Sequence, residues 1–152
     1  MRKSATLIFL LLTAAAPAAP SRHQQALMDR IEQAVVLPKG AKPLSAYGRN
    51  YARSSVTKVV ATYLIPFPPI DASEGCEVML ESLGSRPCTK KELEKSAKSD
   101  ARNVAAQTPA GQRRWYKSTR ELPFIADGGC TQVTVEYNIT THHVVASCNG
   151  YA

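Results

Sequence analysis

The strongest constraint on the fold is a pair of alternating segments near the C-terminus, each with a cysteine at its outer end. Residues 131–137 alternate apolar and polar side chains, and residues 142–148 do so more loosely. Such alternation is typical of half-buried strands. The polar residues 138–141 between them form a short connection, and Gly128-Gly129 breaks the chain just before the first segment. The sequence therefore predicts an antiparallel β-hairpin.

This hairpin predicts a disulfide between Cys130 and Cys148. With residues 138–140 as the loop, Tyr137 faces Thr141, and counting outward places the two cysteines opposite each other on one face. A non-hydrogen-bonded pair brings two strands close enough for a cross-strand disulfide. A two-residue loop would shift the pairing by one residue, and pairing of these cysteines elsewhere in the chain is the alternative.

Residues 1–18 have the order of a secretory signal peptide. A basic start is followed by an apolar run over residues 7–12 and an alanine-rich end. We therefore expect cleavage after Ala18 and a single domain over residues 19–152, without a transmembrane segment. The short signal favours a bacterial protein that is periplasmic or secreted.

The four cysteines of an exported chain favour two disulfides over a metal site. Export brings the chain into an oxidising compartment, and no C-x2-C pair is present to bind zinc. Besides Cys130–Cys148, the sequence predicts Cys76–Cys88, which closes a local loop. We expect no metal ion and no cofactor.

Two capping boxes predict two helices. Ser21 with Gln24 begins the first helix, which should end near Leu37 because a proline follows. Thr89 with Glu92 begins the second, which should lie on the surface with lysines around a thin apolar stripe. The apolar positions recur at helical spacing at Leu27, Ile31, Ala34 and Val35 in the first helix, and at Leu93, Ala97, Ala101 and Val104 or Ala105 in the second.

The remaining segments complete a small α+β fold. Residues 56–65 and 113–118 read as strands, and residues 76–80 could pair with the first of these. Tyr47 and Tyr51 could form one face of a short helix or the wall of a groove, and core packing is the favoured interpretation. We predict an antiparallel sheet that ends in the C-terminal hairpin, with both helices packed on one face.

The sequence contains no motif that requires catalysis. No G-x-S-x-G, H-E-x-x-H, P-loop or G-x-G-x-x-G pattern is present. In the predicted register His142 faces Glu136, which is first of all a surface ion pair, and His143 lies opposite Val135. The alternative to a binding protein is a small periplasmic hydrolase that uses His142, Glu136 and Asp127.

The favoured function is a non-enzymatic binding or structural module of the bacterial envelope. The formal net charge of +7 attracts anionic surfaces without specifying one, so the partner could be an envelope protein or an anionic envelope polymer, and we expect no nucleic acid. If Trp115 packs inward, Arg114 and Tyr116 lie on the outer side of their strand. A cation beside an aromatic ring favours an interface, so these two residues are the candidate binding residues.

The chain also resembles a group of small exported bacterial proteins that is uncharacterised. The resemblance rests on the order AVVLPKGAKPLSAYGRNYA, KVVATYLIP, RRWYKSTRELPFIADGGC and a closing SCNGYA, and it is most specific at the D-G-G-C and C-N-G ends of the hairpin. It implies a small α+β domain with a terminal hairpin and assigns no catalytic residue.

Overall fold

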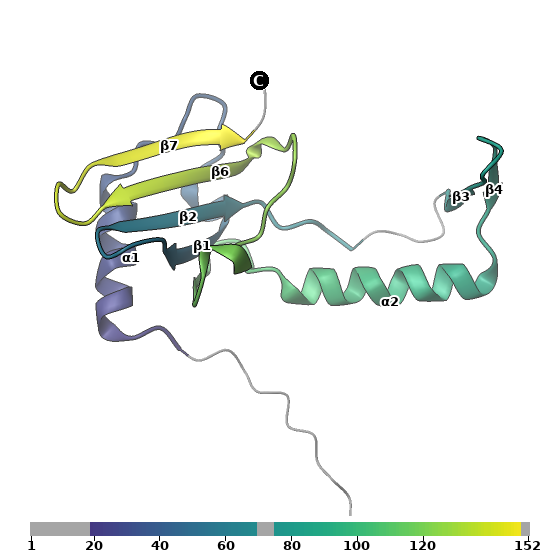
Figure 1. Cartoon of the computed structure of the whole chain (residues 1–152), viewed down its shortest axis with the longest axis horizontal. Helices are drawn as coiled ribbons and strands as arrows, with labels where there is room; N and C mark the ends of the chain where they lie inside the picture. The colour runs from purple at the N-terminus through teal and green to yellow at the C-terminus, as the bar shows by residue number, and fades with distance from the viewer. Residues whose placement is uncertain (1–18, 70–74, 150–152) are drawn as a thin grey trace, which may run out of the picture.

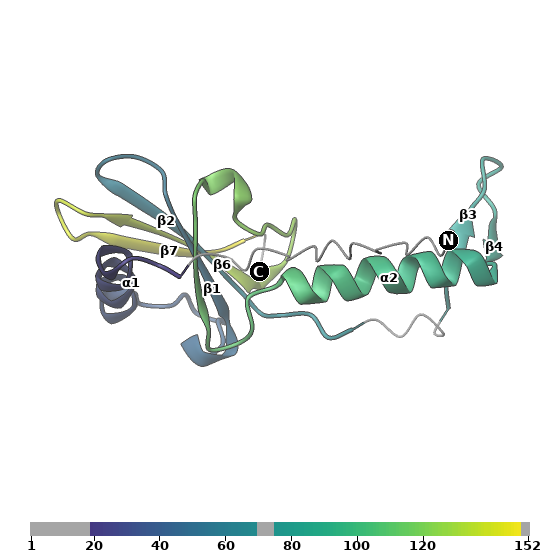
Figure 2. The ribbon, with the colours of Figure 1, turned by 90° about the horizontal axis from the view of Figure 1, so that it is seen from below.

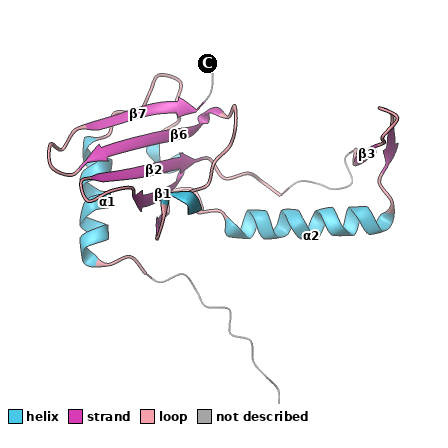
Figure 3. Ribbon diagram, in the orientation of Figure 1, coloured by secondary structure: helices cyan, strands magenta, loops and turns pink. Residues whose placement is uncertain are grey.

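The computed structural model describes residues 19–69 and 75–149, so the predicted signal peptide lies outside the described residues. The elements in chain order are α1 (Arg22–Ala34), the 3-10 helix η1 (Leu44–Ala46), β1 (Gly48–Arg53), β2 (Lys58–Leu64), β3 (Glu77–Met79), β4 (Ser85–Pro87), α2 (Lys90–Ala106), β5 (Arg113–Tyr116), the 3-10 helix η2 (Thr119–Glu121), β6 (Gly129–Asn138) and β7 (Val144–Asn149). They form a five-stranded sheet in the order β5-β1-β2-β6-β7 and a separate two-stranded sheet, β3-β4. The predicted α+β class is confirmed (Figure 3).

Helix α1 begins at the predicted capping box and packs on the larger sheet. The Ser21 side chain accepts a hydrogen bond from the backbone of Gln24, whose side chain accepts one from the backbone of Ser21. The side chains that enter the core are Leu27, Met28 and Ile31. The helix ends at Ala34 rather than near Leu37, and Val35 is already extended. Adjacent β-branched residues favour that extended backbone.

Tyr47 and Tyr51 are both fully buried, which confirms the core interpretation. The helical alternative is wrong, because Tyr47 follows the short helix η1 and Tyr51 lies in β1. Positions of equal parity share one face of an extended chain, so both rings point to the side of the sheet that α1 covers.

Strand β2 is central and has the predicted inward face. It pairs antiparallel with β1 on one side and with β6 on the other. Val59, Ala61 and Tyr63 are buried in the core, as the alternation indicated. The strand ends before the proline-rich segment 66–69, whose prolines cannot donate hydrogen bonds to a neighbouring strand.

Residues 77–79 form a strand, but its predicted place beside β2 is wrong. β3 pairs with β4, and the Cys76–Cys88 disulfide closes this small hairpin at its base. β2 has no free side, since β1 and β6 already flank it. The predicted disulfide is confirmed, and it stabilises a unit separate from the main sheet.

The predicted strand at residues 113–118 is confirmed over Arg113–Tyr116, but it is not antiparallel to its neighbour. β5 runs parallel to β1, with Tyr51 opposite Trp115. Parallel neighbours require a long connection, and the whole segment from β2 to α2 provides it. The sheet is therefore mixed, with β1 and β5 as its parallel pair.

Helix α2 begins at the predicted capping box but does not pack on the sheet. Thr89 and Glu92 form the reciprocal hydrogen bonds of the box. This start lies beside the β3-β4 hairpin, far from the sheet, and only the C-terminal end of the helix reaches the sheet (Figures 1 and 2). None of its residues is buried. Its stripe consists mostly of alanines, which bring too little apolar area to dock a helix on a sheet.

The C-terminal hairpin and the Cys130–Cys148 disulfide are confirmed, but the predicted register is wrong. Tyr137 pairs with Val144 instead of Thr141. The turn is wider because the Asn138 side-chain oxygen accepts hydrogen bonds from the backbone of Thr140 and Thr141, at 2.9 and 3.0 Å. Asparagine commonly organises a turn in this way.

An irregularity at the other end of the hairpin restores the cysteine pairing. Val133 pairs with Cys148, whereas Gly129 pairs with Asn149, so β6 bulges between Gly129 and Val133. The wider turn shifts the register of the two strands, and the extra residues in the bulge reverse this shift. Cys130 consequently reaches Cys148 with a Cα–Cα distance of 4.6 Å.

Candidate interaction sites

The residues of the hydrolase alternative do not come together. Glu136 lies opposite Val145 and forms an exposed ion pair with Lys58 at 2.7 Å, so its predicted pairing with His142 is wrong. His142 lies in the turn, where its Nδ1 is 2.7 Å from the Tyr137 hydroxyl.

The other two positions of that hypothesis lie elsewhere as well. The residue opposite Val135 is Ala146, so the predicted place of His143 is also wrong. Asp127 precedes β6, whereas His142 follows it. Between the pairs Gly129–Asn149 and Tyr137–Val144 the partner strand β7 advances five residues, so β6 separates these ends by roughly 17 Å. The shifted register is the reason that the sequence placed these side chains incorrectly.

Trp115 packs toward the core, which is the condition under which Arg114 and Tyr116 were predicted to bind a partner. Its ring stacks on Tyr51 with ring centroids 6.4 Å apart. Arg114 and Tyr116 therefore lie on the other face, where both are half-buried rather than exposed. Arg114 Nη1 donates to the carbonyl of Ala106 at 2.8 Å, and the guanidinium lies 5.9 Å from the Tyr116 ring centroid. This pair joins the C-terminal end of α2 to β5.

Tyr116 also lines a groove at the base of α2 with a cavity volume of about 410 Å³. Two exposed rings, Phe67 and Phe124, lie along it. The remaining lining comes from β1, from the ends of β2 and α2 with the residues that follow them, and from the segment before β6. It consists of Asn50, Leu64, Pro66, Asn103, Ala106, Gln107, Thr108, Pro123 and Ile125. Grooves of this size with aromatic walls are common binding sites.

Three polar side chains of this groove, Asn50, Gln107 and Thr108, bond within the protein. The buried Asn50 amide donates to the carbonyls of Gly48 and Thr62, and its oxygen accepts from the Thr108 hydroxyl at 2.6 Å. Gln107 accepts a hydrogen bond from the backbone nitrogen of Phe67 at 2.7 Å. These bonds fix the shape of the groove and are not directed at a ligand.

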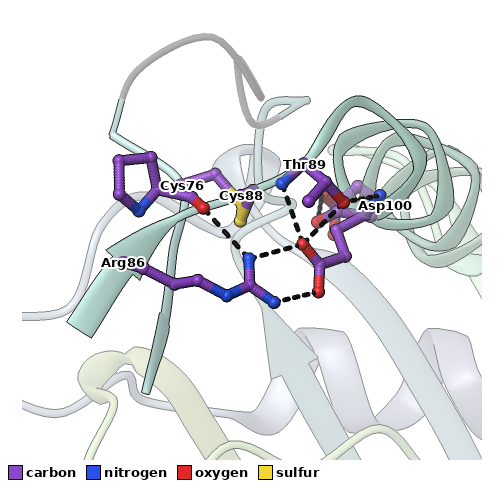
Figure 4. Close-up of a disulfide and its surroundings, with 8 residues drawn as sticks. Cys76, Arg86, Cys88, Thr89 and Asp100 are labelled. Carbon is purple, nitrogen blue, oxygen red and sulfur yellow. Dashed lines mark hydrogen bonds and ion pairs between the residues drawn. A yellow bond between two sulfur atoms is a disulfide. The ribbon is translucent and has the colours of Figure 1, made fainter. Parts of the chain in front are cut away.

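A second candidate site is the arm, which we define as residues 75–107, comprising the β3-β4 hairpin and α2. The hairpin is attached rigidly to the start of the helix. Arg86 donates two hydrogen bonds to the Glu92 carboxylate, at 2.9 and 2.8 Å, and the Thr89 backbone donates a third. Figure 4 shows Arg86, Thr89 and the Cys76–Cys88 disulfide gathered at this junction.

The pKa of Glu92 is well below its usual range. The largest cause is the hydrogen bond from Arg86, followed by the hydrogen bonds from Thr89. Each of these bonds stabilises the ionised carboxylate. The junction between hairpin and helix is therefore held by a charge that persists under acidic conditions.

The far end of the arm exposes an apolar cluster that the sequence analysis missed. We call Met79, Leu80 and Leu83 the tip. Met79 and Leu83 are 79 % and 90 % exposed. Leu83 has a φ of 64°, a left-handed conformation that is rare for a bulky side chain, and its backbone donates to the carbonyl of Leu80. The run of apolar residues at 78–80 was the available signal, but it was interpreted as part of a strand that pairs with residues 56–65.

A charged network between α1 and the sheet was also not predicted from the sequence. Glu32 accepts hydrogen bonds from Arg49 at 2.9 Å and from the Tyr51 hydroxyl at 2.6 Å, and Arg113 pairs with Asp29. Burial raises the pKa of Tyr51 and raises that of Tyr63 to about 12. The network holds α1 on the sheet, and none of its residues lines the groove at the base of α2.

Within residues 19–69 and 75–149, no cluster of three or more His, Cys, Asp or Glu side chains could hold a metal ion. In the same residues no helix has the length and apolar character needed to cross a membrane. Comparison of the chain with protein-family models, with curated proteins and with solved structures found no match.

Proposed function

We propose that this chain is a non-enzymatic exported binding module of the bacterial envelope, and that the tip of its arm docks into an apolar pocket of a protein partner. The exposed tip carries the proposal. Met79 and Leu83 lie at the end of a projecting element. Exposed apolar clusters of this kind mark protein contacts, because their burial in a partner removes apolar area from water.

The rigidity of the arm supports the same proposal. The disulfide and the Arg86–Glu92 hydrogen bonds order the hairpin before any partner arrives. A preformed contact surface loses little conformational entropy on binding, so more of the interaction free energy appears as affinity.

The charges of the arm favour a protein over an anionic polymer at the tip. The turn between β3 and β4 contains Glu81 and no basic residue, so a polyanion would be repelled there. An anionic envelope polymer would instead contact the exposed lysines of α2, which are Lys90, Lys91, Lys95 and Lys98. Contacts between exposed charges weaken as salt rises, whereas apolar burial does not, so the salt dependence of binding separates the two partners.

Two disulfides support an exported location, because such bonds persist in oxidising compartments. No observation favours the hydrolase alternative, since His142, Glu136 and Asp127 are dispersed along and beyond β6. The binding function is therefore the only function that we propose.

The experiment is a pull-down from envelope extract with the purified, oxidised protein as bait. We expect one discrete protein to be retained at high salt by the unaltered chain and lost with Met79→Ser/Leu83→Ser. The matched control is Val56→Ser, which removes an exposed apolar side chain of 83 % exposure from the turn between β1 and β2. Retention by the tip variant, or equal loss with the control, would contradict the proposal.

The candidate residues Arg114 and Tyr116 have a different place in this proposal. They lie at the C-terminal end of α2, next to the sheet, and not at the tip of the arm. We expect Arg114→Ala with Tyr116→Ala to weaken partner binding less than the tip variant does, while the melting temperature of the sheet stays nearly unchanged. Stronger loss of binding in this variant than in the tip variant would move the docking site to the groove.

A further inference from the structure

Strand β7 forms one outer edge of the large sheet, on the side away from α2 (Figure 1). Its inner side bonds to β6. The backbone of Asn138 donates to His143, and Glu136 pairs with Val145. Hydrogen-bonded and non-hydrogen-bonded pairs alternate along an antiparallel ladder. Residues 143, 145 and 147 therefore bond to β6, and the peptide groups of residues 144, 146 and 148 point outward.

These outward groups have no backbone partner among the described residues. β7 also lacks the charges and prolines with which natural proteins protect an edge. Its six residues include no charged side chain and no proline, and its Val145 is 52 % exposed on the face that α1 does not cover. An unprotected edge with an apolar side chain is a template for pairing with another strand.

We propose that a second copy of this chain covers this edge, so that the two β7 strands pair antiparallel about a two-fold axis at Ala146. In this register Ala146 faces Ala146 of the second copy, and Val144 faces Cys148 of the second copy. All of these residues have outward peptide groups, so each facing pair exchanges two hydrogen bonds. The two sheets then form one continuous sheet.

The charges and side chains favour a second copy as the occupant. In a two-fold contact each charged side chain approaches the same side chain of the second copy. In a basic chain this repulsion costs free energy unless the contact surface is uncharged. β7 meets this condition. The opposite edge strand β5 carries Arg113 and Arg114 and does not. On the exposed face Val145 lies opposite Ser147 of the second copy and diagonal to Val145 of that copy, so the pairing also covers apolar area.

This dimer goes beyond the proposed function, because it uses a different surface. The arm leaves the sheet on the side of β1, away from β7 (Figure 1). Both tips therefore stay accessible in the dimer. Two tips on one particle would raise the apparent affinity for a partner that presents two sites.

The first test is the molar mass of the purified, oxidised protein, measured by light scattering over a dilution series. We expect a dimer that dissociates on dilution. Ala146→Pro removes an outward N–H without removing a bond to β6, and proline is accepted on an edge when its nitrogen faces solvent. We expect this variant to raise the dimer dissociation constant roughly tenfold to a hundredfold. Far-UV circular dichroism checks that the variant folds.

The second test does not depend on proline. Val145→Lys/Ser147→Lys places lysines opposite each other across the axis and should give a monomer. Val145→Lys/Ser147→Glu places opposite charges there and should restore the dimer. Val56→Lys adds one lysine at an exposed position outside β7, in the turn between β1 and β2, and should leave the mass unchanged.

Three results would overturn the inference. They are a monomeric unaltered protein at all concentrations, a dimer that survives the paired lysines, and a monomer whose β7 recruits an extended segment of another protein instead. None of these results bears on the tip, whose partner is measured separately by the pull-down.

Discussion

At the scale of single residues, close approaches of the backbone decide which side chains the fold tolerates. Gly48 begins β1 beside the loop that follows α2. A Cβ built on Gly48 would lie 1.9 Å from the carbonyl oxygen of Thr108. Thr108 in turn donates to the buried Asn50. The position therefore admits no side chain unless the backbone of the groove moves.

We predict that Gly48→Ala destabilises the protein by about 1–3 kcal/mol, because it forces two backbone segments apart. Urea unfolding followed by tryptophan fluorescence measures this loss. Gly84→Ala is the matched control, since its Cβ would meet nothing closer than 3.8 Å. Equal stability of the two variants would show that the loop after α2 can move away from Gly48 without a cost in free energy.

A second prediction concerns the ionisation of Glu92. Since the pKa of this carboxyl is lowered in the folded arm, its stabilising effect is present above the usual glutamate pKa and is lost as pH falls through the lowered value. We expect NMR titration to show Glu92 still ionised at about pH 4. Arg86→Gln should raise this pKa toward its usual range, because it removes the largest cause of the shift. An ordinary pKa in the unaltered protein would contradict this assignment.

At the scale of elements, α1 and α2 show why one capped amphipathic helix packs on a sheet and another does not. α1 presents Leu27, Met28 and Ile31 to the sheet, and its carboxylates pair with arginines of β1 and β5. α2 presents mainly alanines and has no buried residue. The size of the apolar side chains, rather than their spacing, separates the packed helix from the projecting one.

The charged network under α1 gives the third prediction. Glu32→Gln leaves Arg49 largely buried without its counter-charge and should lower the free energy of unfolding by about 3 kcal/mol. Asp29→Asn, one turn earlier on the same helix, removes a carboxylate whose side chain is 53 % exposed and should cost less than about 1 kcal/mol. Denaturant unfolding compares the two. A larger effect at Asp29 would show that the network does not hold α1.

At the scale of the whole molecule, the chain consists of a sheet with one helix and an arm that is stapled separately. Each part has its own disulfide. The arm is in sequence an insertion between β2 and β5, and its hairpin shares no strand pairing with the large sheet. The two parts should therefore respond independently to loss of their disulfides.

We predict that Cys76→Ser/Cys88→Ser abolishes amide protection in β3-β4 while the melting temperature of the sheet stays within about two degrees of the unaltered value. Cys130→Ser/Cys148→Ser should lower the free energy of unfolding of the sheet by about 3 kcal/mol, as expected for a loop of this length. Hydrogen exchange and calorimetry measure the two effects. A common loss of stability in both variants would show that the arm and the sheet unfold together.

The sequence by itself determined the features that depend on neighbouring residues or on covalent chemistry. The two capping boxes need only residues three positions apart, so both helix starts were predicted correctly. The inward face of β2 followed from alternation, and both disulfides followed from cysteine number, export and local spacing. These signals keep their meaning in any tertiary context.

The tertiary structure alone decided the features that depend on competition between distant segments. Asn138 widened the turn and a bulge compensated for it, so Cys130 met Cys148 although the predicted register was wrong. β5 pairs with β1 in parallel. β3 pairs with β4, because β1 and β6 already flank β2 on both sides. The exposed tip and the open edge of β7 follow from these choices. A strand offers the same hydrogen bonds to any neighbour, so only packing in the complete fold selects which one it receives.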